Sequence, residues 1–349
     1  MGRKLLWASL VLAPVTFLVR YVFHAGDVTL FVLAGAALIP LAWLIGEATE
    51  HAGNHTGPGI GGFLNASFGN APELIIALFA VNQSLPNVVR GSLAGSVVSN
   101  LLLVLGLALV VGPKEDDRVD RYSALLQLGL VAAAVVLFLV PSVPGWHGNP
   151  ERHSLAVATS PVAAVLLLLY VAVTAFGLRR HRRLYVESGE RPVGGWSLPA
   201  ALGALAAATA LTAVVSEILV HSLHGFADAA GLSEFFIAAV IVAIVGNAAE
   251  HGGAIVIARR AKLPLATEIA ISSSAQVALL VTPVIALLSW LVKPALPLSF
   301  RPIEVAAMGG SAAVVALALA DGRARRWEGI LLVTVYVGVA LGFLAAGDR

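Results

Sequence analysis

The sequence lacks cysteine and has little charge. None of its 349 residues is cysteine, which excludes thiol catalysis, disulfide bonds and cysteine-ligated zinc or iron–sulfur centres. Only 12% of the residues are charged and 58% are hydrophobic, whereas an ordinary soluble domain has about 25% charged residues. So little polar surface cannot cover a soluble core of this size. We therefore expect an integral membrane protein, in which any bound metal uses oxygen or imidazole ligands.

The positive charges are few and gathered in short loops. The net charge is only +2, and no basic helix or aromatic-basic sheet pattern is present, so a nucleic-acid partner is not expected. Loops rich in Lys and Arg stay on the cytoplasmic side of a membrane. A cytoplasmic N-terminus places every basic cluster on that side. These clusters are Lys114, Arg118 and Arg121; the run 179–183; Arg259, Arg260 and Lys262; and Arg323, Arg325 and Arg326.

Long apolar runs predict an all-α polytopic protein. A helix needs about 20 apolar residues to cross the hydrocarbon core, and eleven runs satisfy this requirement. Because the number is odd, the C-terminus is expected outside. The runs are 4–22, 28–46, 62–83, 90–112, 122–141, 155–178, 197–222, 232–258, 267–292, 302–320 and 328–347.

The chain contains an internal repeat. The segment Gly-Asn-Ala-Pro-Glu at 69–73 recurs as Gly-Asn-Ala-Ala-Glu at 246–250, a separation of 177 residues. At the same separation, Gly-Ser-Val-Val-Ser at 95–99 aligns without a gap with Ser-Ser-Ser-Ala-Gln at 272–276. The two copies fall on the third and eighth spans, so they cross the membrane in opposite directions. Inverted repeats of this kind are typical of secondary transporters.

This repeat predicts the division of the chain. An N-terminal transmembrane helix at 1–24 precedes two inverted repeats of five helices each. A polar segment with Gly, Pro and mixed charge reads as a cytoplasmic linker between them. The first repeat is 25–178 with its motif at 65–112, the linker is 179–196, and the second repeat is 197–349 with its motif at 234–291.

Two glutamates lie within these apolar spans. Glu73 is the only formal charge in 63–83, with about ten helical residues, or roughly 15 Å, on either side. Glu250 lies nearer the cytoplasmic third of 232–258, and a helix break at Gly246 or at 252–253 would bring it to a similar depth. A carboxylate at mid-membrane costs about 2.5–3.5 kcal/mol on insertion scales. No Lys or Arg is expected at that depth, so the partner must be a cation or a proton.

Calcium suits a pair of carboxylates. It takes six to eight oxygens, and two carboxylates match its charge; protonating both discharges the site instead. Pro72 would free a backbone carbonyl about four residues earlier as a further oxygen. The small residues of the motifs are equally consistent with close helix packing. The neutral oxygens available for the ion are those of Asn70, Asn247, Ser96, Ser99, Ser273 and Gln276.

Other titratable residues lie close to these motifs. His251 is a candidate proton relay or a packing residue. Glu217, one helical turn before His221, is a candidate secondary proton path, although a structural role is favoured. A further group precedes the third span and is a candidate for gathering cations at the entrance: Glu47, Glu50, His51 and His55.

The motifs resemble those of the calcium/cation antiporter superfamily, and in particular its calcium/proton exchanger branch. They read Asn-Ala-Ser-Phe-Gly-Asn-Ala-Pro-Glu-Leu-Ile at 65–75 and Gly-Asn-Ala-Ala-Glu-His at 246–251. Sodium/calcium exchangers of the superfamily carry Thr-Ser where this chain has Asn-Ala, which favours protons as the counter-ion. The chain departs from the branch at Pro72, at Ser272 and in a linker without a long acidic run.

The resemblance implies a role for each motif residue. It implies that Glu73 and Glu250 bind the cation and exchange protons, assisted by His251 and Glu217 in proton coupling. The neutral cation ligands that it implies are Asn70, Asn247, Ser96, Ser99, Ser273 and Gln276.

The sequence thus predicts a secondary active transporter that exchanges calcium for protons by alternating access. Its partners would be calcium, protons and the lipid bilayer of a bacterial plasma membrane, with no resident cofactor and with homo-oligomerisation left open. Manganese, sodium or potassium as substrate, and a passive cation channel, remain alternatives. An intramembrane hydrolase is disfavoured because no hydrolase motif occurs in the spans, so no enzymatic activity is expected.

Overall fold

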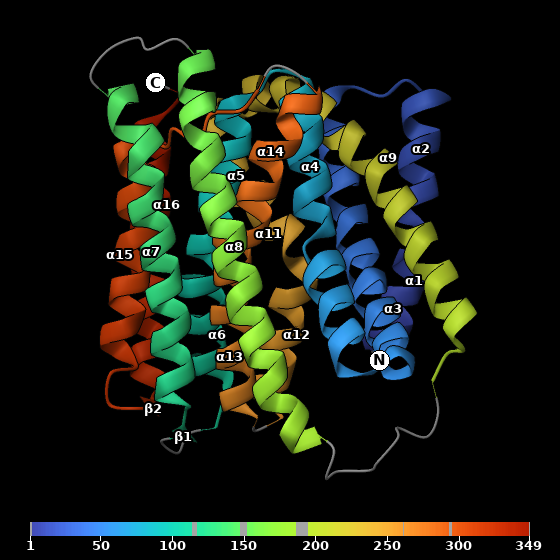
Figure 1. The fold of residues 1–349 in the computed structure, drawn as a ribbon. Helices are drawn as coiled ribbons and strands as arrows, with labels where there is room; N and C mark the ends of the chain where they lie inside the picture. Colours follow the sequence, from blue (N-terminus) through green and yellow to red (C-terminus); the bar gives the residue numbers. More distant parts are fainter. Residues whose placement is uncertain are drawn as a thin grey trace.

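The chain forms a helical bundle (Figure 1). The computed structural model describes residues 2–113, 117–146, 152–185, 195–260, 262–292 and 295–348. Two short strands, β1 (Asp117–Arg118) and β2 (Arg323–Ala324), pair antiparallel at one end of the bundle. The helices, with π-helical segments labelled η, are α1 (Gly2–Ser9), α2 (Leu12–Tyr21), α3 (Asp27–Gly69), α4 (Ala71–Asn82), α5 (Pro86–Val98), η1 (Ser99–Val104), α6 (Leu105–Val111), α7 (Arg121–Trp146), α8 (Arg152–Tyr185), α9 (Leu198–Ala230), α10 (Glu234–Phe236), η2 (Ile237–Val242), α11 (Ala243–Gly246), α12 (Ala248–Arg259), α13 (Leu263–Gln276), η3 (Val277–Val281), α14 (Thr282–Val292), α15 (Pro302–Ala318) and α16 (Arg326–Ala346).

The helices account for the apolar runs of the sequence. Among the described residues, eight helices are long and apolar enough to cross a membrane, and the bent pair α10–α11 and α12 makes nine. The runs at 62–83 and 302–320 fall on two shorter apolar helices, Ala71–Asn82 and Pro302–Ala318. Helix α8 continues to Tyr185, so the predicted linker starts inside a helix; residues 186–194 lie outside the described part.

Helix α3 reverses direction near its middle. A Cβ placed on Gly61 would lie 2.8 Å from the Cα of Gly53. In a straight helix, residues eight apart are separated by about 12 Å. The continuous helical stretch must therefore fold back between these glycines. This reversal separates the predicted second span from the segment that leads to Glu73.

The two halves follow the same order of helices. Helices α4 and α12 have bounds exactly 177 residues apart, and α5 and α13 begin at that same separation. Helix α4 extends toward the top of Figure 1, whereas α12 extends toward the bottom. Both second helices continue into π-helical turns, η1 and η3, which are uncommon and frequently occur at functional sites.

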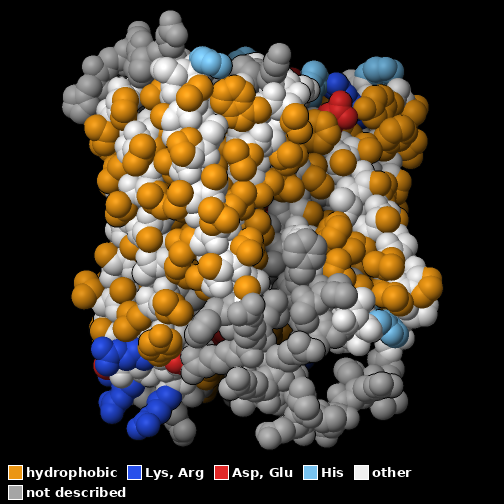
Figure 2. All heavy atoms as spheres, in the orientation of Figure 1, with side chains coloured by type: hydrophobic (Ala, Val, Ile, Leu, Met, Phe, Trp, Pro, Cys, Tyr) orange, Lys and Arg blue, Asp and Glu red, His pale blue; other side chains and the backbone are white. Residues whose placement is uncertain are grey.

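The surface matches a membrane environment. Figure 2 shows hydrophobic side chains covering the face between the two ends of the bundle, with most of its Lys and Arg side chains at the lower end. Pairing of Arg118 with Arg323 brings two of the sequence's basic clusters to one end of the molecule. Lys114 lies outside the described residues.

Helices α5 and η2 pack backbone against backbone. A Cβ on Gly95 would overlap the backbone of Ala239, and a Cβ on Gly91 would lie 2.9 Å from the ring of Phe235. Both contacts join the first half of the chain to the second. Glycine at these positions lets the two motif regions approach each other closely.

We predict that Gly95→Ala destabilises the protein by about 1–3 kcal/mol, because the added methyl group meets rigid backbone. Thermal unfolding of the detergent-purified protein, followed by size-exclusion chromatography, measures this effect. Gly203→Ala in α9 is the matched control, since a Cβ there meets nothing within 4 Å. An equal melting temperature for the two variants would contradict the close approach.

Candidate functional site

Glu73 lies where a transmembrane path is interrupted. Helix α3 ends at Gly69 and α4 begins at Ala71, with Asn70 between them at φ −98° and ψ 15°. Pro72 occupies the first turn of α4, where its missing N–H leaves no helical hydrogen bond unmade. Glu73 is in the same turn, where the helix dipole favours a negative charge. The break therefore provides a favourable position for a carboxylate inside the bundle.

The Glu73 side chain is buried against the other half of the chain. It is 8% exposed, and its Oε2 has no hydrogen-bond partner among the described residues. A Cβ on Gly246 would lie 3.5 Å from Glu73 Oε1. The carboxylate borders a cavity of about 10 Å³, also lined by Ser92 and Ser96, which has room for about one water molecule.

Glu250 follows a second interruption of the same kind. Helix α11 ends at Gly246 and α12 begins at Ala248, and Asn247 between them has φ −89° and ψ 9°. The two helical segments are bent by 58°. Of the two breaks considered from sequence, the structure forms the one at Gly246. Glu250 lies in the first turn of α12, half-buried, and accepts a hydrogen bond from Ser273 Oγ.

The two carboxylates belong to one site. Glu73 and Glu250 are close enough to interact electrostatically. Helix α11, which leads into the second break, contacts both α3 and α4, which flank the first. Among the described residues there is no cluster of three or more His, Cys, Asp or Glu side chains. The charged part of the site is therefore a pair, and further ligands must be neutral oxygens.

Hydrogen bonds between the halves surround this pair. Asn70 Nδ2 donates to Gln276 Oε1 at 2.9 Å, and Asn247 Nδ2 donates to Ser96 Oγ at 2.8 Å. Each asparagine of one repeat thus bonds to a polar residue on the second helix of the other. Ser99 is buried next to Ser96 and donates to its carbonyl oxygen at 3.3 Å.

Asn100 is a buried member of the site that the sequence reasoning missed. Its Nδ2 donates to Asn247 Oδ1 at 3.4 Å, and its Oδ1 lies 2.9 Å from His251 Nε2. His251 is 8% exposed and is joined through these amides to Ser96. The available signal was a second polar residue directly after Ser99 in an apolar run. Comparing the repeats did not flag it, because the matching position is Val277.

Glu217 and His221 lie apart from this network. Both side chains are exposed on α9, and no hydrogen bond joins them to the glutamate pair within the described residues. The proton-coupling role predicted for Glu217 is therefore without a structural link, whereas that for His251 has one.

The acidic and histidine residues before the third span form a separate contact. His51 Nε2 lies 3.4 Å from Glu47 Oε1, and the His51 ring stacks on Trp196 at 4.9 Å. His55 Nε2 lies 2.8 Å from the Trp196 carbonyl oxygen. These residues fasten α3 to the chain that enters α9, and Glu50 remains exposed beside them.

The chain was compared with known proteins. The model of the family described as sodium/calcium exchanger protein matches residues 27–178 and 200–345. These two segments cover most of the chain and coincide with its two halves. The chain belongs to this family. It is thereby an integral membrane protein.

Relatives of this family member confirm the resemblance to the calcium/proton exchanger branch. It is 39% identical to the Ca(2+)/H(+) antiporter ChaA of Bacillus subtilis, over 92% of this chain and 93% of that protein. It is 32% identical to the Ca(2+)/H(+) antiporter of Aphanothece halophytica, over 98% and 96% of the two chains.

Solved structures share its fold. The structure of native YfkE matches with a TM-score of 0.83 and 35% identity, covering 98% of both chains. The H+/Ca2+ exchanger CAX matches with a TM-score of 0.76 over 99% of this chain and 91% of that one. At 17% identity, the CAX match concerns the fold alone.

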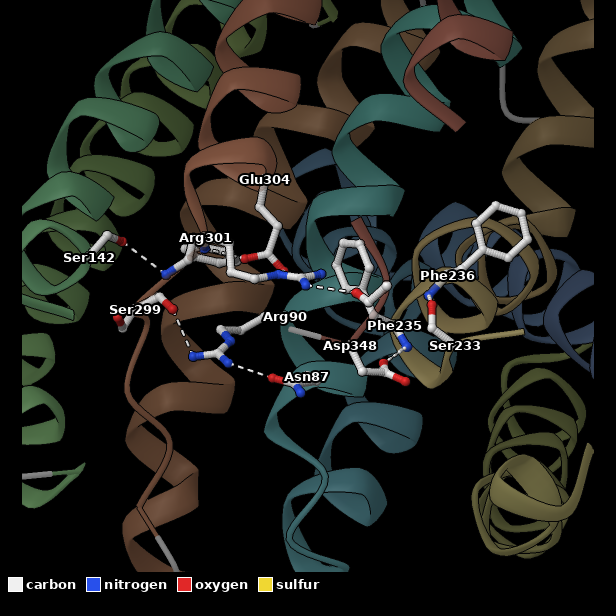
Figure 3. Close-up of polar contacts among 12 residues, drawn as sticks. Asn87, Arg90, Ser142, Ser233, Phe235, Phe236, Ser299, Arg301, Glu304 and Asp348 are labelled. Atoms are coloured by element: carbon white, nitrogen blue, oxygen red, sulfur yellow. Dashed lines mark hydrogen bonds and ion pairs between the residues drawn. The ribbon is translucent and has the colours of Figure 1, made fainter. Parts of the chain in front are cut away.

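In this exchanger-family chain, the helix leading to Asn247 is anchored at its outer end. Figure 3 shows Asp348 against the start of α10, where its carboxylate accepts hydrogen bonds from the backbone N–H groups of Phe235 at 2.8 Å and Glu234 at 3.1 Å. Ser233 Oγ accepts from Phe236 N at 3.1 Å. The N–H groups that begin this helix are therefore capped by side chains.

Arg301 holds the same C-terminal segment. Its Nη1 donates to Gly347 O at 2.8 Å, and its guanidinium lies 3.6 Å from the centre of the Phe235 ring. Glu304 accepts a hydrogen bond from the Arg301 backbone N–H at 2.5 Å. The end of the chain thus ties α16 and α15 to the second broken helix.

We predict that Asp348→Ala lowers stability by about 0.5–2 kcal/mol, as expected for loss of a helix cap. Asp348→Asn keeps one acceptor oxygen and should give an intermediate melting temperature. Thermal unfolding of the purified variants measures both. A wild-type melting temperature for the alanine variant would show that the cap contributes nothing.

We also predict that Asn100→Ala lowers transport at least tenfold, because it leaves the buried polar groups of His251 and Asn247 without partners. Cation flux into proteoliposomes measures this. Asn82→Ala, at the exposed end of α4, is the control and should transport normally. Normal flux in the Asn100 variant would remove Asn100 from the site.

Proposed function

We propose that the protein is a secondary active transporter that exchanges calcium for protons, with Glu73 and Glu250 binding either the cation or protons. The observation that carries this proposal is the convergence of two glutamates from the two halves on one buried site without a cationic side chain. No ion pair links Glu73 or Glu250 to Lys or Arg within the described residues. Relatives named as Ca(2+)/H(+) antiporters support the same substrate pair.

Charge balance supports exchange at this site. Two anionic carboxylates in a low-dielectric interior repel each other and lose hydration, so the empty doubly charged state is unfavourable. One divalent cation or two protons neutralise them equally well. Calcium tolerates irregular oxygen ligands, which the amide and hydroxyl groups around the pair supply. A cycle that alternates between these two loaded states moves calcium one way and protons the other.

Opposed half-helices support an alternating-access mechanism. The first-turn positions of Glu73 and Glu250 follow corresponding breaks, and α4 and α12 extend toward opposite ends of the bundle. In transporters with inverted repeats, discontinuous helices of this kind hold the substrate near the midplane. We infer that the two halves form inverted repeats and that the end bearing Arg118 and Arg323 is cytoplasmic, as the positive-inside rule requires.

A bacterial plasma membrane is the proposed location, in agreement with the bacterial relative from Bacillus subtilis. Other hard cations remain candidate substrates, because sites of carboxylate and amide oxygens discriminate between them by geometry. A passive channel would conduct without proton coupling. The buried, unhydrated setting of Glu73 favours binding and exchange over free conduction.

We predict that Glu73→Gln and Glu250→Gln each reduce proton-driven calcium uptake by at least 100-fold, because one carboxylate cannot neutralise the ion or carry both protons. Uptake of radioactive calcium by inverted vesicles under an imposed pH gradient measures this. Asp228→Asn removes an exposed carboxylate from the end of α9 and should transport normally. Normal uptake by either glutamine variant overturns the proposal, and uptake of manganese but not calcium by the wild type would change the substrate.

A further inference from the structure

A second cavity lies where α7 and α13 begin, away from the glutamate pair. Its volume is about 150 Å³, and none of its lining residues lines the cavity beside Glu73. Helix α13 contacts both α7 and the neighbouring strand β1. The polar residues that line it are Asp120, Ser123, Gln127, Thr267 and Glu268.

Two buried polar atoms in this cavity have no partner within the described residues. Thr267 is only 2% exposed, yet its hydroxyl makes no hydrogen bond. Gln127 donates from Nε2 to Ser123 Oγ at 3.1 Å, which leaves its Oε1 buried and unbonded. Because buried polar groups are normally hydrogen-bonded, these oxygens indicate a ligand or ordered water in the cavity. All of the atoms concerned can accept, so the ligand must offer positive charge or donors.

The charges around the cavity select a cation. Asp120 and Glu268 form no ion pair with the described residues, and no Lys or Arg lines the cavity. The neighbouring Arg121 packs its side chain against Gly322 instead. Asp120 Oδ1 accepts from the backbone N–H groups of Tyr122 at 3.0 Å and Ser123 at 3.2 Å, which caps α7. Two helix N-termini contribute about half a positive charge each, so the two carboxylates leave a net charge of about −1.

We propose that this cavity binds a hydrated divalent cation, separately from the glutamate pair. A volume of 150 Å³ corresponds to about five waters at roughly 30 Å³ each, enough for calcium with part of its hydration shell. Calcium accepts carboxylate, amide and hydroxyl oxygens together with water. With two carboxylates and several waters, the affinity falls in the weak class, with a Kd of about 0.1–1 mM.

The site lies on a helix that also reaches the glutamate pair. Thr267 and Glu268 precede Ser273 on α13 by only about one and a half turns, or roughly 9 Å. Ser273 donates to Glu250, and Gln276 accepts from Asn70. A cation held at the start of α13 therefore acts on the element that carries two ligand candidates. Binding itself does not depend on the proposed transport of calcium by Glu73 and Glu250.

The test is equilibrium dialysis with radioactive calcium on the full-length protein in detergent. In Glu73→Gln/Glu250→Gln protein we expect about one bound calcium per chain. Adding Asp120→Asn/Glu268→Gln should weaken it at least tenfold, while the Asn side chain can still cap α7. Thr267→Val, which removes only the hydroxyl, should weaken it several-fold. Absence of residual binding, or binding unchanged by Asp120→Asn/Glu268→Gln, overturns the proposal.

Controls separate this site from charge loss in general. Asp228→Asn/Asp321→Asn removes two carboxylates elsewhere and should leave the residual site intact. If the glutamine background is unstable, Asp120→Asn/Glu268→Gln in the otherwise unaltered chain should lower the calcium bound by one per chain, and an unchanged number overturns the proposal. Vesicle uptake in the unaltered protein tests transport independently, so a chain that binds calcium here but does not transport it would refute only the proposed function.

Discussion

Two carboxylates held in a buried site cannot both remain charged and empty, because burial removes their hydration and proximity adds repulsion. Glu73 and Glu250 meet this condition, and the surrounding structure supplies no cationic side chain to relieve it within the described residues. The occupant must therefore come from solution as a cation or as protons. Selectivity, coupling and direction all depend on how the protein manages this one requirement.

The helix breaks make such a site affordable. At Asn70 and Asn247 the chain leaves helical geometry for a single residue and starts a new helix, so each glutamate gains the positive end of a helix dipole. The same breaks aim the asparagine amides across the interface between the halves, where Gln276 and Ser96 receive them. Charge stabilisation and cross-interface contact thus have one structural origin.

Close packing and peripheral anchors hold these pieces in register. The glycines of α5 let η2 approach at backbone distance, which brings Ser96 within reach of Asn247. At the far end of the same broken helix, Asp348 caps α10, and Arg301 fastens the final residues. At the opposite end of the bundle, the α7–α13 cavity borders the helix that carries Ser273. The glutamate pair is therefore connected to both ends of the protein by continuous helices.

Much of this was determined by sequence. Low charge and long apolar runs fix a helical membrane protein, since lipid forbids unpaired backbone and penalises charge. The repeated Gly-Asn-Ala-x-Glu segment identified both glutamates and the breaks beside them, because Gly, Asn and Pro are unfavourable inside a helix and Glu is unfavourable inside a membrane. Candidate spans appear at most of the expected positions for the same reason.

Tertiary structure decided the rest. Asn100 entered the site only because α5 and α12 come together, which no periodicity or repeat comparison encodes. Glu217 lies on an exposed face of α9 although its spacing to His221 resembled a motif, because spacing along a helix does not specify which face packs inward. The cavity of Asp120, Gln127 and Thr267 joins residues from separate halves of the chain. Local sequence specifies helices and costly residues, whereas contacts between distant segments determine which of those residues share a site.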